Sequence, residues 1–284
     1  METARKRTTL TLEPAVTAWL AHQGPRIRPT SFEKCQNHSR RWLADWGNRA
    51  LNEITTADLD KHLGKRLRTC SPGTVALDLK ILKGFFQWAI RTGITDYNPT
   101  LNVLPPRVPE RTPRALSRKE EQEVLAYLPP KWGNMVVFAI ETGLRVRTIC
   151  ELTWEMVNLE RGWMRLPGHC LKSGRQLEAP LSKRALELLK ALAAVCRAEG
   201  RIFETADRHW IGRIWRNAVR KAGIPPCRFH DLRVTFFSRC RQRGVPIEVA
   251  MALSDHHSIA VAMKVYRCVD IREYLRAMGR EETS

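Results

Sequence analysis

Apolar side chains recur every three or four positions through most of the first hundred residues. This spacing predicts amphipathic helices over residues 12–22, 30–46, 56–68 and 72–92. The last of them is clearly bounded, with Ser71 as N-cap, Pro72 in the first turn and Gly93 at its end. The large aromatic residues fall at helical spacing, so we expect them in the core of a small all-helical domain: Trp19, Trp42, Trp46, Phe85, Phe86 and Trp88.

Prolines interrupt the helical pattern between Asn102 and Leu116. Their density stops helices and favours extended chain. The arginines between them are expected either to follow a phosphate backbone or to form a plain basic spacer: Arg107, Arg111 and Arg114. We therefore predict a helical domain over residues 1–102, a linker over 103–116 and a second domain over 117–284.

The second domain combines helices with a small sheet. Ser117 and Glu120 form a capping-box pattern that opens a helix to about Leu128, and an apolar helix follows over residues 131–141. Residues 156–168 alternate around a tight turn at 160–162, and residues 174–182 predict a third short strand. Further helices are expected over 182–198, 207–221, 229–242, 246–253, 258–266 and 270–278, with a short strand near 201–203. The expected fold class is mainly α with a small antiparallel β-sheet.

The charge of the chain is far from balanced. The 48 Lys and Arg residues against 29 Asp and Glu give a formal net charge of +19 and a pI of about 10.2. Phosphate contacts dominate the affinity of proteins for nucleic acids, so nucleic acid is the expected partner. A ribosome-associated protein, a membrane-surface protein and a merely solvated basic face are the alternatives. No apolar run approaches the roughly 20 residues of a membrane span.

The cysteines do not suggest a metal site. Of the eight, the closest pair, Cys227 and Cys240, is 13 residues apart, which matches no zinc spacing. The basic N-terminus lacks the apolar segment of a signal peptide, and this predicts a cytoplasmic protein with reduced thiols. Neither a metal nor another cofactor is expected.

Four segments of the second domain contain arginine, lysine, histidine and tyrosine in an informative order. Arg145 directly follows a Thr-Gly-Leu turn, and Lys172 lies in a turn between two predicted strands. His230 and Arg233 are three positions apart, which places them on one face of a predicted helix. The last segment, ALSDHHSIAVAMKVY, contains the remaining candidates: His256, His257 and Tyr266.

In order and local sequence these segments resemble the tyrosine recombinases of the phage-integrase type, and the likeness extends over nearly the whole chain. The resemblance implies a helical core-binding domain and an α/β catalytic domain that form a clamp around duplex DNA. It also implies a site-specific recombinase that integrates or excises a mobile element or prophage. Such enzymes act as a homotetramer on two DNA sites, and the resemblance leaves room for an accessory DNA-bending protein. The C-terminal segment 268–279 would dock on a neighbour or pack on its own domain.

The residue types suit the cleavage of a phosphodiester. Arg145 and Arg233 offer permanently charged, bidentate donors for the charge that develops on the non-bridging oxygens. Tyr266 is the candidate nucleophile, because a covalent link to the DNA preserves the bond energy for rejoining without ATP. Lys172 is expected to contact DNA and to protonate the leaving 5′-oxygen, while His230 and His256 relay protons or donate to the phosphate.

Three positions depart from the family pattern. The Leu-Gly-His box reads Leu-Ser-Asp-His, so its histidine is either His256 or His257; we favour His256, because a hydrophobic residue follows three positions later. Three positions after the first arginine, where the family commonly has an acidic residue, this chain has Thr148. Asp255, beside His256, is expected to favour the protonated imidazole.

Other interpretations remain open at this point. Arg145 would otherwise be a helix-surface arginine, Lys172 a turn lysine and Tyr266 a packing residue. A type IB topoisomerase or a hairpin telomere resolvase shares the residue types, although the chain is short for either. A catalytically weak or inactive relative that regulates by binding DNA is the alternative outside enzymes. The target sequence and the direction of the reaction are not predicted.

Overall fold

The computed structural model of the protein describes residues 10–195, 199–203, 208–256, 259 and 262–263. Contacts along the backbone divide the chain into two compact units, Met1–Arg111 (unit 1) and Thr112–Ser284 (unit 2), and the division falls inside the expected linker. Residues 103–117 form neither helix nor strand.

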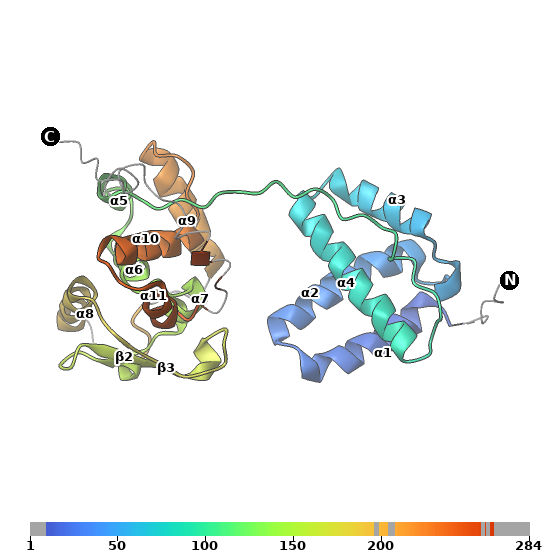
Figure 1. Ribbon diagram of the computed structural model, residues 1–284, viewed down its shortest axis with the longest axis horizontal. Helices are drawn as coiled ribbons and strands as arrows, with labels where there is room; N and C mark the ends of the chain where they lie inside the picture. The colour runs from blue at the N-terminus through green and yellow to red at the C-terminus, as the bar shows by residue number, and fades with distance from the viewer. Residues whose placement is uncertain (1–9, 196–198, 204–207, 257–258, 260–261, 264–284) are drawn as a thin grey trace. The chain divides into compact units, whose positions relative to one another are not determined.

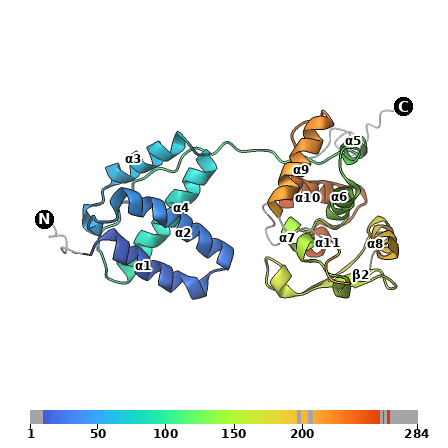
Figure 2. The same cartoon turned by 180° about the vertical axis from the view of Figure 1, so that it is seen from behind.

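Unit 1 is helical at the predicted positions (Figures 1 and 2). Its start and stop signals act as expected: the Ser71 hydroxyl accepts from the backbone N–H of Thr74, and Gly93 has a φ of 72°. Such caps satisfy the unpaired backbone groups of a helix end. The described part of this unit contains α1 (Leu12–Gln23), α2 (Pro29–Trp46), α3 (Thr56–Leu67) and α4 (Pro72–Arg91), with 3-10 turns η1 (Gly24–Arg26) and η2 (Leu51–Glu53).

Aromatic side chains fill the core of unit 1, as predicted. The ring of Trp19 meets Phe85 edge-on at 5.6 Å between centroids, and Phe86 meets Phe85 in the same way at 5.1 Å. Trp42, Trp46 and Trp88 are buried with them. Edge-on contacts of this kind add to the stabilisation that apolar burial provides.

A charged cluster lies within the same helical unit. The carboxylate of Asp78 on α4 accepts from Trp42 Nε1 (2.8 Å) and from Arg66 Nε (3.2 Å), and His62 Nε2 lies 3.3 Å away. The second ring nitrogen of His62 contacts Asp45 at 2.6 Å. Because a buried carboxylate needs such partners, this cluster ties α2, α3 and α4 together.

Unit 2 joins short helices to a three-stranded sheet, and the expected fold class is confirmed. The sheet is antiparallel in the order β1-β2-β3, with Val157 opposite Met164 and Leu166 opposite Leu177. The elements of the described chain are α5 (Arg118–Leu125), α6 (Pro130–Thr142), α7 (Val146–Glu151), β1 (Val157–Asn158), β2 (Trp163–Leu166), β3 (Leu177–Pro180), α8 (Lys183–Val195), α9 (Arg208–Lys221), α10 (Leu232–Gln242) and α11 (Ile247–Leu253), with 3-10 turns η3 (Trp154–Met156), η4 (Gly168–Cys170) and η5 (Phe229–Asp231).

Some expectations for unit 2 need correction. No strand forms at 201–203, where Arg201 makes only an isolated bridge to Thr153. The helix expected over 229–242 begins as the 3-10 turn η5, so His230 precedes α10 rather than lying on it. The predicted helices over 258–266 and 270–278 lie largely or wholly outside the described residues.

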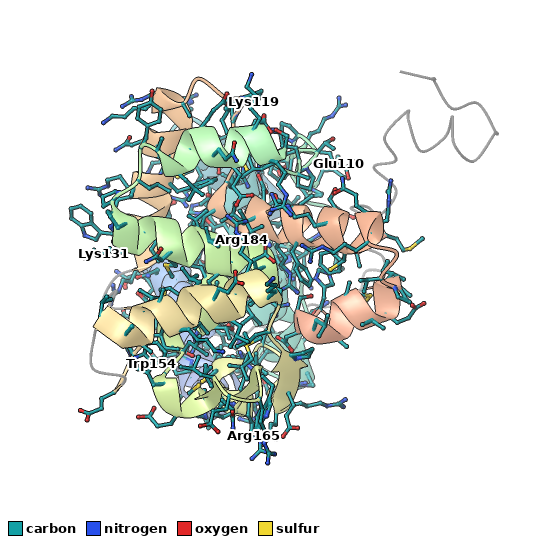
Figure 3. All side chains as sticks on the ribbon, turned by 90° about the vertical axis from the view of Figure 1, so that its left-hand side faces the viewer. Glu110, Lys119, Lys131, Trp154, Arg165 and Arg184 are labelled. Atoms are coloured by element: carbon teal, nitrogen blue, oxygen red, sulfur yellow. The ribbon has the colours of Figure 1, made fainter. Side chains whose placement is uncertain are left out.

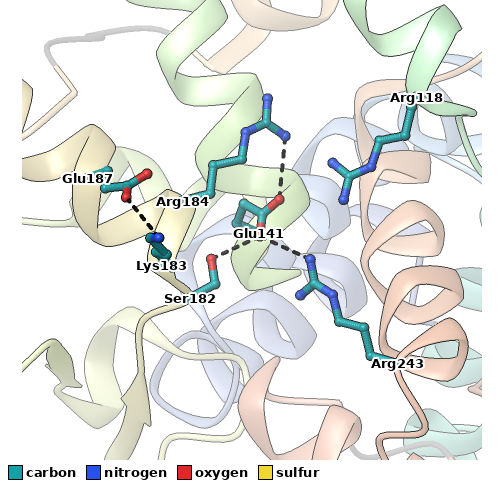
Figure 4. Close-up of a pocket in the computed structure, with 7 residues that line it drawn as sticks. All are labelled: Arg118, Glu141, Ser182, Lys183, Arg184, Glu187 and Arg243. Carbon is teal, nitrogen blue, oxygen red and sulfur yellow. Dashed lines mark hydrogen bonds and ion pairs between the residues drawn. The ribbon is translucent and has the colours of Figure 1, made fainter.

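Helix α6 is central to unit 2 and packs against α8 and α10. In Figure 3 it lies between α5 and α8, and Arg184 of α8 is labelled where α6 and α8 lie side by side. Two buried carboxylates hold these helices. Glu121 of α5 pairs with Arg184 (2.6 Å) and, through a short contact, with Arg239 of α10. Glu141 of α6 lines a pocket, where it accepts from the Ser182 hydroxyl at 2.8 Å (Figure 4).

Within the described ranges, no helix combines the length and the hydropathy that a membrane span requires.

Candidate active site

Two turns of the chain meet around the side chain of Arg233. This residue lies in the first turn of α10 and is 5% exposed. Its Nη1 donates to the carbonyl oxygens of Gly143 and Ser254, both at 2.6 Å. The turn that ends α6 and the turn that follows α11 are therefore fixed against each other by one guanidinium group.

The turn between α6 and Arg145 requires a glycine at position 143. Its φ is 63°, in the left-handed region that ends many helices. A Cβ atom there would lie 2.3 Å from the ring of Phe236 on α10. The Thr-Gly-Leu sequence is thus explained by close packing, and it delivers Arg145 to the N-cap of α7.

His256 completes the group around Arg233. Its Nδ1 accepts from Arg233 Nε (3.2 Å) and lies 2.8 Å from Nη2, and its ring meets Phe237 edge-on at 5.4 Å. Because a nitrogen that accepts these bonds carries no proton, the ring proton lies on Nε2. The Nε2–H is then a donor on the side of the ring that faces away from Arg233.

Arg145 is held by the same turn. Its Nη1 donates to the Asp255 carboxylate (Oδ2, 2.5 Å) and to the Asp255 carbonyl oxygen (2.7 Å). We expected the Asp255 carboxylate to act on its neighbour His256 and to favour the protonated imidazole. The hydrogen bonds argue otherwise, because the carboxylate pairs with Arg145 while Nδ1 of His256 accepts from Arg233.

The charges in this group influence one another. Burial and the positive charge of Arg145 lower the pKa of Arg233 to about 9, and Asp255 offsets part of this effect. Arg233 therefore keeps its charge at neutral pH. Desolvation and the charges of Arg233 and Arg145 also lower the pKa of His230, against the opposing effect of Asp231.

Lys172 lies in the loop between η4 and β3 and is exposed. This loop is closed tightly at its base, because a Cβ atom on Gly168 would lie 2.2 Å from the carbonyl oxygen of Gly174. Thr148 of α7 is buried and donates from its hydroxyl to the Cys170 carbonyl oxygen at 3.0 Å. The helix that follows Arg145 is thereby linked to the loop of Lys172.

The structure brings Arg145, Arg233 and His256 together through direct bonds or through the turn at 254–256. The positive charges of Arg233 and Arg145 also act on the imidazole of His230. The proposed nucleophile Tyr266 and the alternative histidine His257 lie outside the described residues. Sequence reasoning missed Asp255 as a partner of Arg145. The available signal was its position, since an aspartate stands where the family pattern has glycine.

The linker arginines differ in their surroundings. Arg107 and Arg111 are exposed. Arg114 donates through Nη1 to Glu120 and through Nη2 to the Pro225 carbonyl oxygen, both at 2.8 Å. These bonds give Arg114 a structural role within unit 2 that the linker interpretation did not include.

Comparisons of the sequence with known proteins point in one direction. The profile of the phage integrase family matches residues 116–272. The shufflon-specific DNA recombinase of Escherichia coli is 30% identical over 227 residues, which are 74% of this chain and 57% of that protein. The tyrosine recombinase XerA of Thermococcus kodakarensis is 27% identical over 260 residues and 87% of each chain. A putative integrase/recombinase of Haemophilus influenzae is 26% identical, and the match spans 64% of its length.

The fold is shared with solved structures of low sequence identity. A lambda integrase tetramer bound to a Holliday junction matches with a TM-score of 0.79 at 18% identity, over 93% of this chain and 82% of that one. A lambda integrase dimer bound to a core site matches with a TM-score of 0.75 at 19% identity, over 88% and 96%. Together with the profile match over more than half of its residues, these likenesses show that the chain belongs to the phage integrase family of tyrosine recombinases.

Proposed function

We propose that the protein is a site-specific DNA recombinase that cuts and rejoins strands through a covalent bond between Tyr266 and a 3′-phosphate. The observation that carries this proposal is the grouping of Arg145 and Arg233 around the turn at 254–256, where two fixed positive charges lie beside the histidine donor His256. Such a group is suited to bind a phosphate and to stabilise the charge that develops when it is attacked.

Each side chain has a distinct task in the proposed reaction. The Tyr266 oxygen attacks the scissile phosphorus, and the bond to the 5′-oxygen breaks. Arg145 and Arg233 donate to the non-bridging oxygens, and the Nε2–H of His256 provides a further donor. Lys172 gives the leaving 5′-oxygen its proton, and His230, neutral at pH 7 because its pKa is lowered, relays protons.

No metal ion is needed for this scheme. Two guanidinium groups and a lysine already supply the positive charge that Mg²⁺ provides in other phosphoryl transfers.

Double-stranded DNA is the proposed substrate. Besides the net charge of +19, helix α9 supports this: Arg213, Arg216, Arg220 and Lys221 are exposed on it, together with Trp210. A basic helix face of this kind suits a phosphate backbone or a groove. Arg107 and Arg111 of the linker are proposed to add further phosphate contacts.

The biological role is proposed as integration or excision of a mobile element or prophage, by a homotetramer acting on two DNA sites. What supports the assembly is the fold shared with the lambda integrase tetramer that was solved on a Holliday junction. The strand exchange itself needs no energy source, since the phosphotyrosine preserves the energy of the broken bond.

A suicide substrate tests the proposal. Duplex DNA nicked near the crossover point loses the short strand after cleavage, so the covalent protein–DNA adduct accumulates and survives denaturation. We expect the adduct with the wild-type protein and none with Tyr266→Phe, because phenylalanine lacks the attacking oxygen, while duplex binding is retained. Excess chelator should leave adduct formation unchanged.

One control variant and two arginine variants sharpen the test. Tyr274→Phe removes another tyrosine of the same C-terminal stretch and should form the adduct normally. Arg145→Ala and Arg233→Ala should bind DNA but form adduct about 10²–10³-fold more slowly, the usual cost of losing an oxyanion donor. An adduct that persists in Tyr266→Phe would contradict the assignment, and mass spectrometry of the digested adduct would then identify the attached residue.

A further inference from the structure

Two of the departures from the family pattern, Thr148 and Asp255, are close to the same arginine. Thr148 stands three positions after Arg145, where an acidic residue is common, and its hydroxyl donates to the Cys170 carbonyl oxygen. Asp255 stands where glycine is common, and its carboxylate binds Arg145. The chain therefore lacks an acid at position 148 of α7 and has one at position 255, on the turn after α11.

The contact between Asp255 and Arg145 is suited to orientation. The side chain of Asp255 is 4% exposed and that of Arg145 is 25% exposed, so the carboxylate lies beneath a guanidinium that still reaches solvent. Both bonds from Arg145 to Asp255 use Nη1. The edge formed by Nε and Nη2 has no hydrogen bond to any other described residue. This is one of the two edges with which arginine binds a phosphate in bidentate geometry.

Asp255 also moderates the repulsion between the two arginines. The charge of Arg145 lowers the pKa of Arg233, and the charge of Asp255 raises it. Two guanidinium groups that bind one phosphate must stay close before the phosphate arrives. A carboxylate beside them reduces the cost of that arrangement.

The backbone at Asp255 is in the left-handed region, which glycine adopts more readily than aspartate. Its φ is 53°, and among the described residues it is the only one other than glycine with a positive φ. A side chain adds a steric cost in this conformation, smaller for aspartate than for most residues, whereas glycine adopts it freely. At this glycine position the bond from Arg145 to the Asp255 carboxylate offsets that cost.

The geometry points to Asp255 as a positioning residue for Arg145. From the turn after α11, its carboxylate gives Arg145 the support that an acid at position 148 would give from α7. This inference rests on the proposed function, because it concerns how Arg145 meets the scissile phosphate. A competing possibility is that Asp255 blocks Arg145 and has to be displaced by DNA. The two readings predict opposite effects of removing the carboxylate.

The test compares Asp255→Asn with wild type on the suicide substrate. Asparagine keeps the size of the side chain and removes its charge. We expect the rate of adduct formation at saturating DNA to fall about 10- to 100-fold, less than for removal of a direct oxyanion donor, with duplex affinity unchanged. Glu248→Gln, which removes an exposed carboxylate from α11 of the same segment, is the matched control and should not change the rate.

A second substrate separates positioning from a purely structural effect. A methylphosphonate at the scissile position lacks one charged non-bridging oxygen, so its cleavage depends less on Arg145. The loss in Asp255→Asn should then shrink to about threefold or less on this substrate. An equal loss on both substrates would overturn the inference, as would a rate in Asp255→Asn equal to or above that of wild type. If wild type itself formed no adduct, the proposed function would fail instead.

Should Asp255→Asn fold poorly, Asp255→Gly serves in its place, because glycine relieves the backbone at φ 53° while removing the carboxylate. It should be more stable than Asp255→Asn and equally slow on phosphate DNA. A fast Asp255→Gly would again overturn the inference.

Discussion

The side chains of Lys172 and His256 are held to different degrees by their surroundings. His256 is fixed through Nδ1 by a buried arginine, whereas Lys172 is exposed in a loop after η4. A fixed donor suits a phosphate oxygen whose position is constant. A long side chain on a loop suits a leaving oxygen that moves away. We therefore assign the role of proton donor to Lys172 and not to His256.

This assignment of Lys172 leads to a test by substrate chemistry. Lys172→Ala should form adduct about 10²–10⁴-fold more slowly, the usual contribution of a general acid. A substrate with sulfur in place of the leaving 5′-oxygen should restore the rate, because a thiolate departs without a proton. The same substrate should not restore Arg145→Ala, which serves as the control; a Lys172→Ala variant that stays slow with sulfur would remove Lys172 from the acid role.

Helices and strands of this chain were predictable where the signals were local. In the described part of unit 1, α1 to α4 begin and end within one residue of their predicted limits, because caps such as Ser71 and the apolar spacing agree. The strand predicted at 201–203 does not form, because the pairing there is limited to one isolated bridge between Arg201 and Thr153. His230 falls in a 3-10 turn since the capping contact between Arg228 and Asp231 tightens the start of α10.

The candidate site was predictable only in part for a related reason. The order of the boxes gave the basic residues, but the pairing of Arg145 with Asp255 joins positions 110 residues apart. No local pattern encodes such a contact. Neighbours in sequence suggested His256 as the partner of Asp255, and the turn at 254–256 directs the two side chains to different arginines.

The helices of unit 1 should respond to pH through His62. Burial alone would lower its pKa, but the carboxylates of Asp78 and Asp45 outweigh burial and raise the pKa above the usual 6.5. A raised pKa contributes stability that is complete below about pH 6.5 and is lost as the pH rises through the raised value. Amide protection in α3 and α4, corrected for intrinsic exchange, should therefore be greater near pH 6 than near pH 9.

Two variants check the origin of that pH dependence by hydrogen exchange of the full chain. His62→Gln should show the same protection at both pH values. Asp45→Asn, which removes one of the two carboxylates, should move the loss of protection to lower pH. A wild-type protein whose α3 and α4 exchange alike at both pH values would show that His62 does not titrate in this range.

DNA binding by the whole molecule should depend steeply on salt. Each phosphate contact contributes about −0.9 to the slope of log K against log salt concentration, and a net charge of +19 supports many contacts. The double variant Arg107→Gln/Arg111→Gln should reduce the magnitude of the slope by up to about 1.8, equally on specific and unrelated duplexes. Fluorescence anisotropy at several salt concentrations measures both; a selective loss on one duplex would instead indicate base recognition by the linker.

The bonds of Arg233 have a consequence for how relatives of this chain are found. Two of its contacts are to the backbone carbonyls of Gly143 and Ser254, and every amino acid at position 254 provides such a carbonyl. A substitution at position 254 that fits this buried site therefore leaves the contact in place. A search for the residue motif Leu-Gly-His would not find this chain. A search for the backbone conformation of the turn after α11 would find it.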